Sequence, residues 1–161
     1  MAKIHLEKFK MQDFPYYYRL VSDEKVMAQI TERSIPLEEA QTNFETIVKR
    51  NNKDDETGSY KITDARRGGF IGQGHVTRYQ EAKEVAEIGY MILPEYWGKG
   101  YGTEIARLLV DLAQQAEIRK LKAIIDPENH ASRKILLRQQ FVSEKVCEID
   151  GLPGEILGRV L

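Results

Sequence analysis

The stretch Pro94-Glu95-Tyr96-Trp97-Gly98-Lys99-Gly100-Tyr101-Gly102-Thr103-Glu104 decides the fold assignment, because it joins the end of an expected strand to the start of an expected helix. Its three glycines occupy alternate positions, and glycine lets the backbone approach a ligand closely and adopt positive φ angles. A helix that begins here presents free N–H groups and the positive end of its dipole in its first turn. The stretch therefore predicts a binding site for a phosphate group.

The segment after this glycine loop predicts a long amphipathic helix. From about Tyr101, apolar side chains recur three or four positions apart and form one stripe, at Ile105, Leu108, Leu109, Leu112, Ala113 and Ala116. Three strands are expected before the loop, at 59–63, 70–79 and 85–93. The short polar connections between them are typical of antiparallel hairpins.

The remaining segments alternate between helical and strand patterns. Expected helices begin after Asp13, which we predict to be the N-cap, near Pro36, and at 132–139. Expected strands cover 4–9, 121–125, 141–149 and 155–161, with the last turn at 151–154. This order predicts an α+β fold with a mixed, mostly antiparallel central sheet flanked by helices. With no internal repeat or linker, we expect 1–161 to form a single domain.

Bulk composition argues against several classes of function. The net charge of −1, from 24 Lys and Arg against 25 Asp and Glu, gives no reason to expect nucleic acid or an anionic membrane as a partner. No apolar run approaches the ~18 residues of a membrane helix, and the first residues lack the apolar core of a secretory signal. Cys147 is the only cysteine, and His5, His75 and His130 lack metal-ligand spacing. We expect a cytoplasmic protein without a metal.

Two common phosphate-binding motifs do not fit the glycine loop. A Walker A loop ends in Gly-Lys-Ser/Thr, whereas Lys99 lies between glycines. A Rossmann fingerprint requires glycine at the position of Thr103, after a strand of a βαβ unit rather than of a hairpin. The other alternative is a flexible connection without a ligand. This alternative is disfavoured because ordering a glycine-rich segment costs conformational entropy that no ligand contact would then offset.

The stretch 97–104 resembles the acetyl-CoA pyrophosphate loop of the GNAT superfamily of N-acetyltransferases. The glycines of the family pattern match Gly100 and Gly102, while Trp97 stands where Arg or Gln is usual. The loop and the later segment 129–132 are most similar to the branch that contains the ribosomal-protein alanine N-acetyltransferases. Two positions depart from the family: Gln140 replaces a glycine, and Leu136 stands where many members carry a catalytic tyrosine.

The resemblance implies a set of residues that bind acetyl-CoA. Backbone N–H groups of the loop are expected to hold the pyrophosphate, at Gly98, Lys99, Gly100, Tyr101, Gly102 and Thr103. Lys99 either adds charge near the phosphates or is a solvated loop residue. The backbone at the preceding strand end is expected to pair with the pantetheine arm, at Tyr90, Met91 and Ile92. The side-chain amide of Asn129 resembles the group that binds the same arm.

Transfer to an amine also requires proton transfers. An alkyl ammonium with a pKa near ~10 leaves about one molecule in a thousand neutral at pH 7, so a general base is needed. Glu87 resembles the strand-borne glutamate of the family and is our predicted base; an exposed strand carboxylate is the alternative. Ser132 is the predicted proton donor to the coenzyme A thiolate, or simply the N-cap of the following helix. N–H groups near Met91 are expected to stabilise the oxyanion, and a ping-pong route through Cys147 is disfavoured.

These expectations combine into one leading function. The resemblance implies an N-acetyltransferase that moves an acetyl group from acetyl-CoA to a primary amine by direct transfer in a ternary complex. The acceptor could be a protein N-terminus, a polyamine or a small amine, and a homodimer is possible. The alternative is a coenzyme A-binding sensor or regulatory domain without catalysis, which would gain nothing from Glu87.

Overall fold

The computed structural model describes residues 3–28, 30–31 and 33–161. One seven-stranded sheet has the order β1-β2-β3-β4-β5-β7-β6. Its strands are β1 Ile4–Lys8, β2 Gly58–Asp64, β3 Phe70–Arg78, β4 Val85–Ile92, β5 Lys120–Ile125, β6 Val142–Ile149 and β7 Leu152–Val160. All neighbouring strands are antiparallel except the parallel pair β4 and β5. The predicted α+β fold with a mixed, mostly antiparallel sheet is confirmed.

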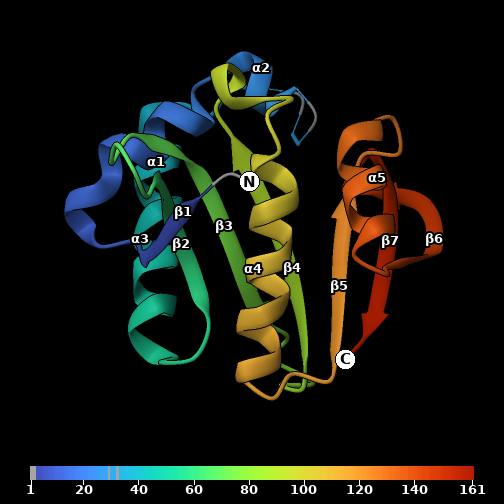
Figure 1. Ribbon diagram of the computed structural model, residues 1–161. Helices are drawn as coiled ribbons and strands as arrows, with labels where there is room; N and C mark the ends of the chain where they lie inside the picture. Colours follow the sequence, from blue (N-terminus) through green and yellow to red (C-terminus); the bar gives the residue numbers. More distant parts are fainter. Residues whose placement is uncertain (1–2, 29, 32) are drawn as a thin grey trace.

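Helices cover the two faces of this sheet (Figure 1). They are α1 Phe14–Val21, α2 Glu24–Met27, α3 Leu37–Lys53, α4 Tyr101–Gln115 and α5 His130–Arg138, with single 3-10 turns at Met11–Asp13 and Pro94–Tyr96. The first three helices and one sheet face share a core around Phe9, Leu20 and Phe44. The stripe of α4 packs on the other face in a second core, around Ile105 and Leu109. Within the described residues, none of these helices has the length and hydrophobicity needed to cross a bilayer.

The sheet opens between its two parallel strands. β4 and β5 pair only from Val85 to Glu87 and from Lys120 to Lys122. Beyond this point β4 continues to Ile92, and the two strands lie further apart, as the upper half of Figure 1 shows. The edge of β4 that faces β5 is therefore unpaired over its last residues, although it lies in the middle of the sheet.

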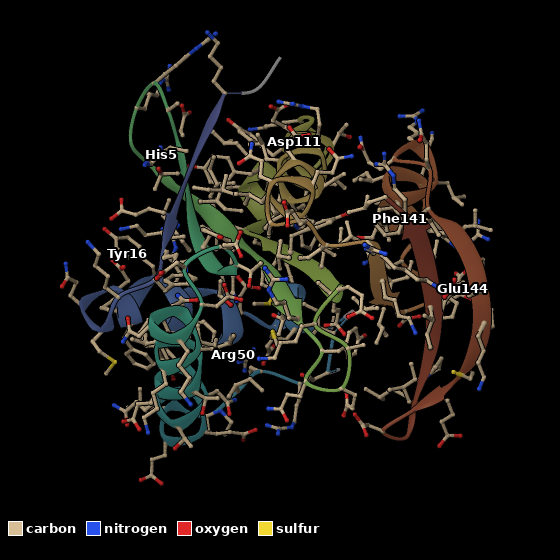
Figure 2. All side chains as sticks on the ribbon, turned by 90° about the horizontal axis from the view of Figure 1, so that it is seen from below. His5, Tyr16, Arg50, Asp111, Phe141 and Glu144 are labelled. Atoms are coloured by element: carbon tan, nitrogen blue, oxygen red, sulfur yellow. The ribbon has the colours of Figure 1, made fainter. Side chains whose placement is uncertain are left out.

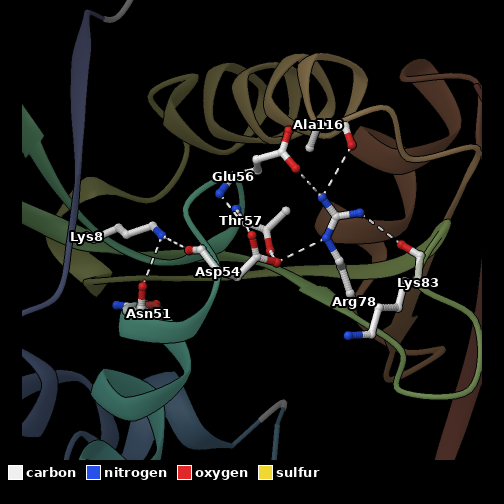
Figure 3. A network of polar contacts seen from close by, with 8 residues as sticks. All are labelled: Lys8, Asn51, Asp54, Glu56, Thr57, Arg78, Lys83 and Ala116. Atoms are coloured by element: carbon white, nitrogen blue, oxygen red, sulfur yellow. Dashed lines mark hydrogen bonds and ion pairs between the residues drawn. The ribbon is translucent and has the colours of Figure 1, made fainter.

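A polar cluster holds together the loops at the end where β4 and β5 are still paired (Figure 3). The guanidinium of Arg78 donates to Asp54 Oδ2 at 3.0 Å and to Glu56 Oε1 at 3.2 Å. It also donates to the backbone carbonyls of Lys83 at 2.9 Å and Ala116 at 3.3 Å. One side chain thus joins the end of α3, the β3–β4 connection and the end of α4. All three lie at the end of the sheet where β4 and β5 are paired, and not at the end where they separate.

One local prediction was right only in position, and another was wrong. Asp13 occupies the N-cap position of α1, but its side chain accepts from the Lys10 N–H at 2.9 Å and pairs with Lys61 Nζ at 3.0 Å. The last turn is not 151–154: it is the two residues Asp150 and Gly151, with φ of 51° and 80°. Two positive φ angles are what a tight two-residue hairpin needs, so β7 begins already at Leu152.

Candidate active site

A pocket of about 440 Å³ occupies the opening between β4 and β5. Its walls include Glu87, Tyr90 and Met91 of β4, the end of β5, and Asn129 and Ser132 at the start of α5. Five of the predicted site residues, distributed over more than forty positions of the sequence, therefore line one space. The predicted residues Ile92 and 98–103 lie outside this lining, further along the same chain segment.

The pocket passes through the sheet from one face to the other. Successive side chains of a strand point to opposite faces. Ile88 and Tyr90 belong to the core beside α4 and α5, whereas Met91 packs into the core beside α1 and α3. Glu87 shares the face of Met91 by this alternation, while Ser132 of α5 lies on the face of Tyr90. A molecule that fills the opening could thus meet Glu87 from one side and Ser132 from the other.

Strand alternation also decides which backbone groups of β4 are available. Leu93 donates its N–H to Ile71 of β3 at 2.9 Å, and Val85 accepts from Tyr79 at 3.0 Å. Odd-numbered residues of β4 therefore face β3, and even-numbered ones, including Tyr90 and Ile92, face the opening. The Ile92 carbonyl accepts from the indole Nε1 of Trp97 at 2.8 Å, which leaves its N–H and both groups of Tyr90 turned to the opening.

Met91 is placed differently from its two neighbours. It is paired with Gln73 of β3 and its backbone faces that strand, so only its side chain reaches the pocket. The expectation of oxyanion-binding N–H groups near Met91 consequently moves to the amides beside it.

The glycine loop combines left-handed backbone with a helix start. Gly98 and Gly100 have φ of 71° and 89°, and Gly100 is the N-cap of α4. The first backbone hydrogen bond of the helix runs from the Glu104 N–H to the Gly100 carbonyl, at 3.3 Å, so the preceding N–H groups have no helical partner. A Cβ built on Gly98 or Gly100 would have no neighbour within 4 Å in the described part of the chain. The space next to these two glycines is therefore free for a ligand to approach the backbone.

Gly102 has a different structural role. A Cβ at this buried position would lie 2.8 Å from Ile135 Cδ1 of α5. Glycine here permits close packing of α4 against α5, beside the wall that carries Ser132. Lys99 on the loop and Thr103 in the first turn of α4, in contrast, are exposed, and Tyr101 is half-buried against the ring of Tyr96.

Glu87 lies in a partly desolvated position on the α3 side of the sheet. Burial raises the pKa of its carboxyl above the ordinary value, and the positive charge of Arg50 opposes this shift. His75 Nε2 lies 3.9 Å from Glu87 Oε2, and its Nδ1 lies 3.0 Å from Thr77 Oγ1. Burial, together with Arg50, lowers the pKa of His75 to about 4. His75 is therefore neutral at pH 7 and does not compensate the Glu87 charge.

The start of α5 differs from the prediction and adds a hydroxyl pair. The helix begins at His130 with Asn129 as N-cap, whose Oδ1 accepts from the Ser132 N–H at 3.2 Å. Ser132 is thus not the N-cap, and its hydroxyl lies 3.4 Å from the hydroxyl of Tyr90. Burial raises the pKa of Tyr90, and the contact with Ser132 lowers it in part. The sequence predicted a role only for the backbone of Tyr90. The alternation of side chains along β4 could have indicated that the Tyr90 side chain lies on the opposite face from Glu87.

A second pocket, of about 290 Å³, lies between α3 and the sheet and is called here the α3 pocket. Its α3 wall consists of Asn43, Thr46, Ile47 and Arg50, and its sheet wall of Ser59, Gln73 and His75. Figure 2 shows Arg50 on the side of α3 that faces the central strands. Gln73 and His75 line both pockets, which therefore adjoin at these two side chains. No residue of the α3 pocket was assigned a role from the sequence.

The chain is similar in sequence and in fold to known proteins. The chain is 38% identical over 89 residues to the uncharacterized protein YkkB of Bacillus subtilis, across 54% of this chain and 52% of that protein. The chain thus matches about half the length of this curated relative.

Two solved structures share the whole fold. The spermidine N-acetyltransferase from Vibrio cholerae in complex with CoA and spermine has a TM-score of 0.81 at 17% identity, over 98% of this chain and 95% of that chain. A GNAT superfamily phosphinothricin acetyltransferase from Sinorhizobium meliloti in complex with AcCoA has 0.78 at 19% identity, over 100% and 89%. Residues 3–142 match the family described as Acetyltransferase (GNAT) domain, so the chain belongs to the GNAT acetyltransferase family.

Proposed function

We propose that the protein moves an acetyl group from acetyl-CoA to a primary amine by direct transfer in a ternary complex. The observation that carries this proposal is the pocket through the sheet, with Glu87 on one face and the Ser132–Tyr90 hydroxyl pair on the other. Two substrates that approach from opposite faces could meet there without a covalent enzyme intermediate. Cys147 lies on the edge strand β6 and is not among the described residues that line this pocket.

The residues around the opening fit acetyl-CoA in two ways. The free N–H groups at 98–103 and the start of α4 suit a pyrophosphate, because both supply positive charge without side chains. The Tyr90 carbonyl and the Ile92 N–H, which face the opening, suit an amide-containing arm that extends the sheet like a strand. Acetyl-CoA supplies the activated acetyl thioester; binding, orientation and proton transfer fall to the protein.

Glu87 is the proposed general base. A carboxyl whose pKa is raised by burial is a better proton acceptor than an exposed glutamate, since basicity rises with pKa. It takes a proton from the incoming amine as the C–N bond forms. Neutral His75 beside it leaves the carboxylate free to accept that proton.

The hydroxyl pair of Ser132 and Tyr90 is the proposed proton source for the leaving thiolate. When the C–S bond breaks, sulfur takes the electron pair and then a proton from one of these hydroxyls. Tyr90 approaches from β4 and Ser132 from α5, so β4 contributes a tyrosine hydroxyl where Leu136 of α5 cannot. The free N–H of Tyr90 is the proposed donor to the oxyanion.

Several finer assignments stay predictions. They are the ribosomal-protein alanine N-acetyltransferase branch, the single domain over 1–161, a homodimer and a cytoplasmic location. The competing function is a coenzyme A-binding sensor without catalysis.

The decisive experiment measures binding and turnover separately. Acetyl-CoA at a hundredfold excess over its Kd should stabilise the native protein by about 2.7 kcal/mol, and therefore raise Tm by at least about 5 °C for a chain of this size. Thiol release with a panel of amines measures turnover. E87Q should reduce kcat by about 10²- to 10³-fold and leave the Tm shift unchanged. E84Q, an exposed control in the turn just before the same strand, should match wild type.

Each alternative has its own outcome. A Tm shift without turnover of any amine favours the sensor. No shift with acetyl-CoA removes the acetyltransferase assignment, and full turnover in E87Q removes Glu87 as the base.

A further inference from the structure

We propose that the α3 pocket receives the acceptor and selects amines that carry a carboxylate or another oxyanion, rather than polyamines. This inference rests on the proposed function and specifies its acceptor. The amine end would reach Glu87, and the anionic end would lie against Arg50.

The first argument is continuity. Gln73 and His75 line both pockets, and His75 Nε2 lies 3.9 Å from Glu87 Oε2. A molecule in the α3 pocket therefore contacts the same two side chains that lie beside the proposed base. It also approaches on the sheet face opposite to Ser132, which leaves that face for acetyl-CoA.

The second argument is charge. Among the described residues, Arg50 is the one arginine, lysine or carboxylate that lines the α3 pocket. Within the described residues Arg50 forms no ion pair, and neither do Arg66, Arg67, Arg119, Arg138 and Arg159, but of these six arginines only Arg50 lines one of the two pockets. Its positive charge also acts on both His75 and Glu87. A guanidinium with unused donors, facing a pocket, is suited to a carboxylate or phosphoryl group.

The third argument is the pattern of donors and acceptors. Asn43, Thr46 and Arg50 lie three and four positions apart, on one face of α3. Asn43 and Arg50 can donate hydrogen bonds to an oxyanion, whereas the Thr46 hydroxyl already donates to the Thr42 carbonyl at 3.3 Å. On the opposite wall, Gln73 is only 6% exposed, and its Oε1 has no hydrogen-bond partner among the described residues. A buried carbonyl oxygen without a donor is costly, and the N–H of an amine substrate would satisfy it.

A polyamine would satisfy only one end of this arrangement. Its first amine could reach Gln73 and Glu87, but its next ammonium would face Arg50. The carboxylates Asp126 and Asp150 belong to the other side of the first pocket, beside β5 and the β6–β7 turn. The arrangement of charge along the α3 pocket therefore favours an amine with a negative group at its far end.

Matched substrate pairs test this inference. Thiol release is measured with glycine, β-alanine, γ-aminobutyrate and glutamate, each beside its amide, and with spermidine. For at least one pair, kcat/KM of the acid should exceed that of the amide and of spermidine by tenfold or more. R50Q should abolish this preference through a higher KM, with the acetyl-CoA Tm shift unchanged. K49Q removes the same charge from an exposed neighbouring position and should retain the preference.

The results separate the two proposals. Turnover that favours spermidine, or that treats acids and amides alike, overturns the acceptor inference and leaves the acetyltransferase intact. The same holds if acetyl-CoA binds but no carboxylate-bearing amine reacts or binds, or if R50Q keeps the preference. No binding of acetyl-CoA overturns the proposed function itself.

Discussion

Replacement of Arg78 by methionine tests whether the polar cluster closes the paired end of β4 and β5. The Arg78 side chain is 19% exposed and makes four hydrogen bonds to three separate loops. Methionine keeps the aliphatic volume and removes all four donors. The change does not alter any residue of the candidate active site, which lies in the opening between β4 and β5.

The magnitude follows from the partners. The bonds to the carbonyls of Lys83 and Ala116 contribute about 1 kcal/mol each. The pair with Asp54, whose side chain is 31% exposed, adds about 1 kcal/mol, and the pair with Glu56, at 59%, adds little. Water can hydrate the groups that lose Arg78, which recovers a part of this stabilisation. R78M should therefore lose about 2–3 kcal/mol of unfolding free energy. For a chain of this size the Tm then falls by about 8 °C.

The pH dependence gives a second signature. Burial alone would raise the pKa of Asp54, but hydrogen bonds from Thr57, Glu56 and Arg78 outweigh it and lower the pKa to about 2. Because the folded pKa lies below the unfolded one, the charged carboxylate stabilises the fold above about pH 4, and this contribution disappears as the pH falls towards 2. The difference between wild type and R78M should therefore narrow over that interval.

Urea unfolding at several pH values measures both effects. R66M, at an exposed position of the β2–β3 turn, is the control and should stay within about 0.5 kcal/mol of wild type. A loss below 1 kcal/mol in R78M, or a loss that is equal at pH 7 and pH 2, would refute this account of the cluster.

Three further predictions concern the site. The kcat/KM of wild type should rise with pH through an apparent pKa above that of an ordinary glutamate, because burial raises the pKa of Glu87; E87Q should lack this step in a pH–rate profile. G100A should weaken acetyl-CoA binding in calorimetry, because a φ of 89° is strained for alanine by about 1 kcal/mol, while G68A, at a φ of 74° in a remote turn, should lose similar stability but keep its affinity. Y90F should lower kcat about tenfold or more with acetyl-CoA affinity unchanged; wild-type turnover in Y90F would exclude its hydroxyl as the proton source.

Local patterns were sufficient to predict most elements. The three- and four-residue spacing of apolar side chains predicted α4, and the alternation of polar and apolar residues with short turns predicted the hairpins. The glycine loop was predicted because positive φ angles and a helix start are properties of a few adjacent residues. The predicted side-chain cap at Asp13 is absent because that carboxylate pairs with Lys61, a partner distant in sequence.

The sequence by itself therefore determined the α+β class, the order of elements and the loop that resembles an acetyl-CoA site. Only the tertiary structure decided that β4 and β5 separate after Glu87, and that Tyr90 meets Ser132 across the opening. It alone placed Arg50 of α3 beside Gln73 of β3 in a second pocket. The physical reason is that secondary structure follows from side chains within one or two turns, whereas a pocket depends on which faces of distant elements are packed together.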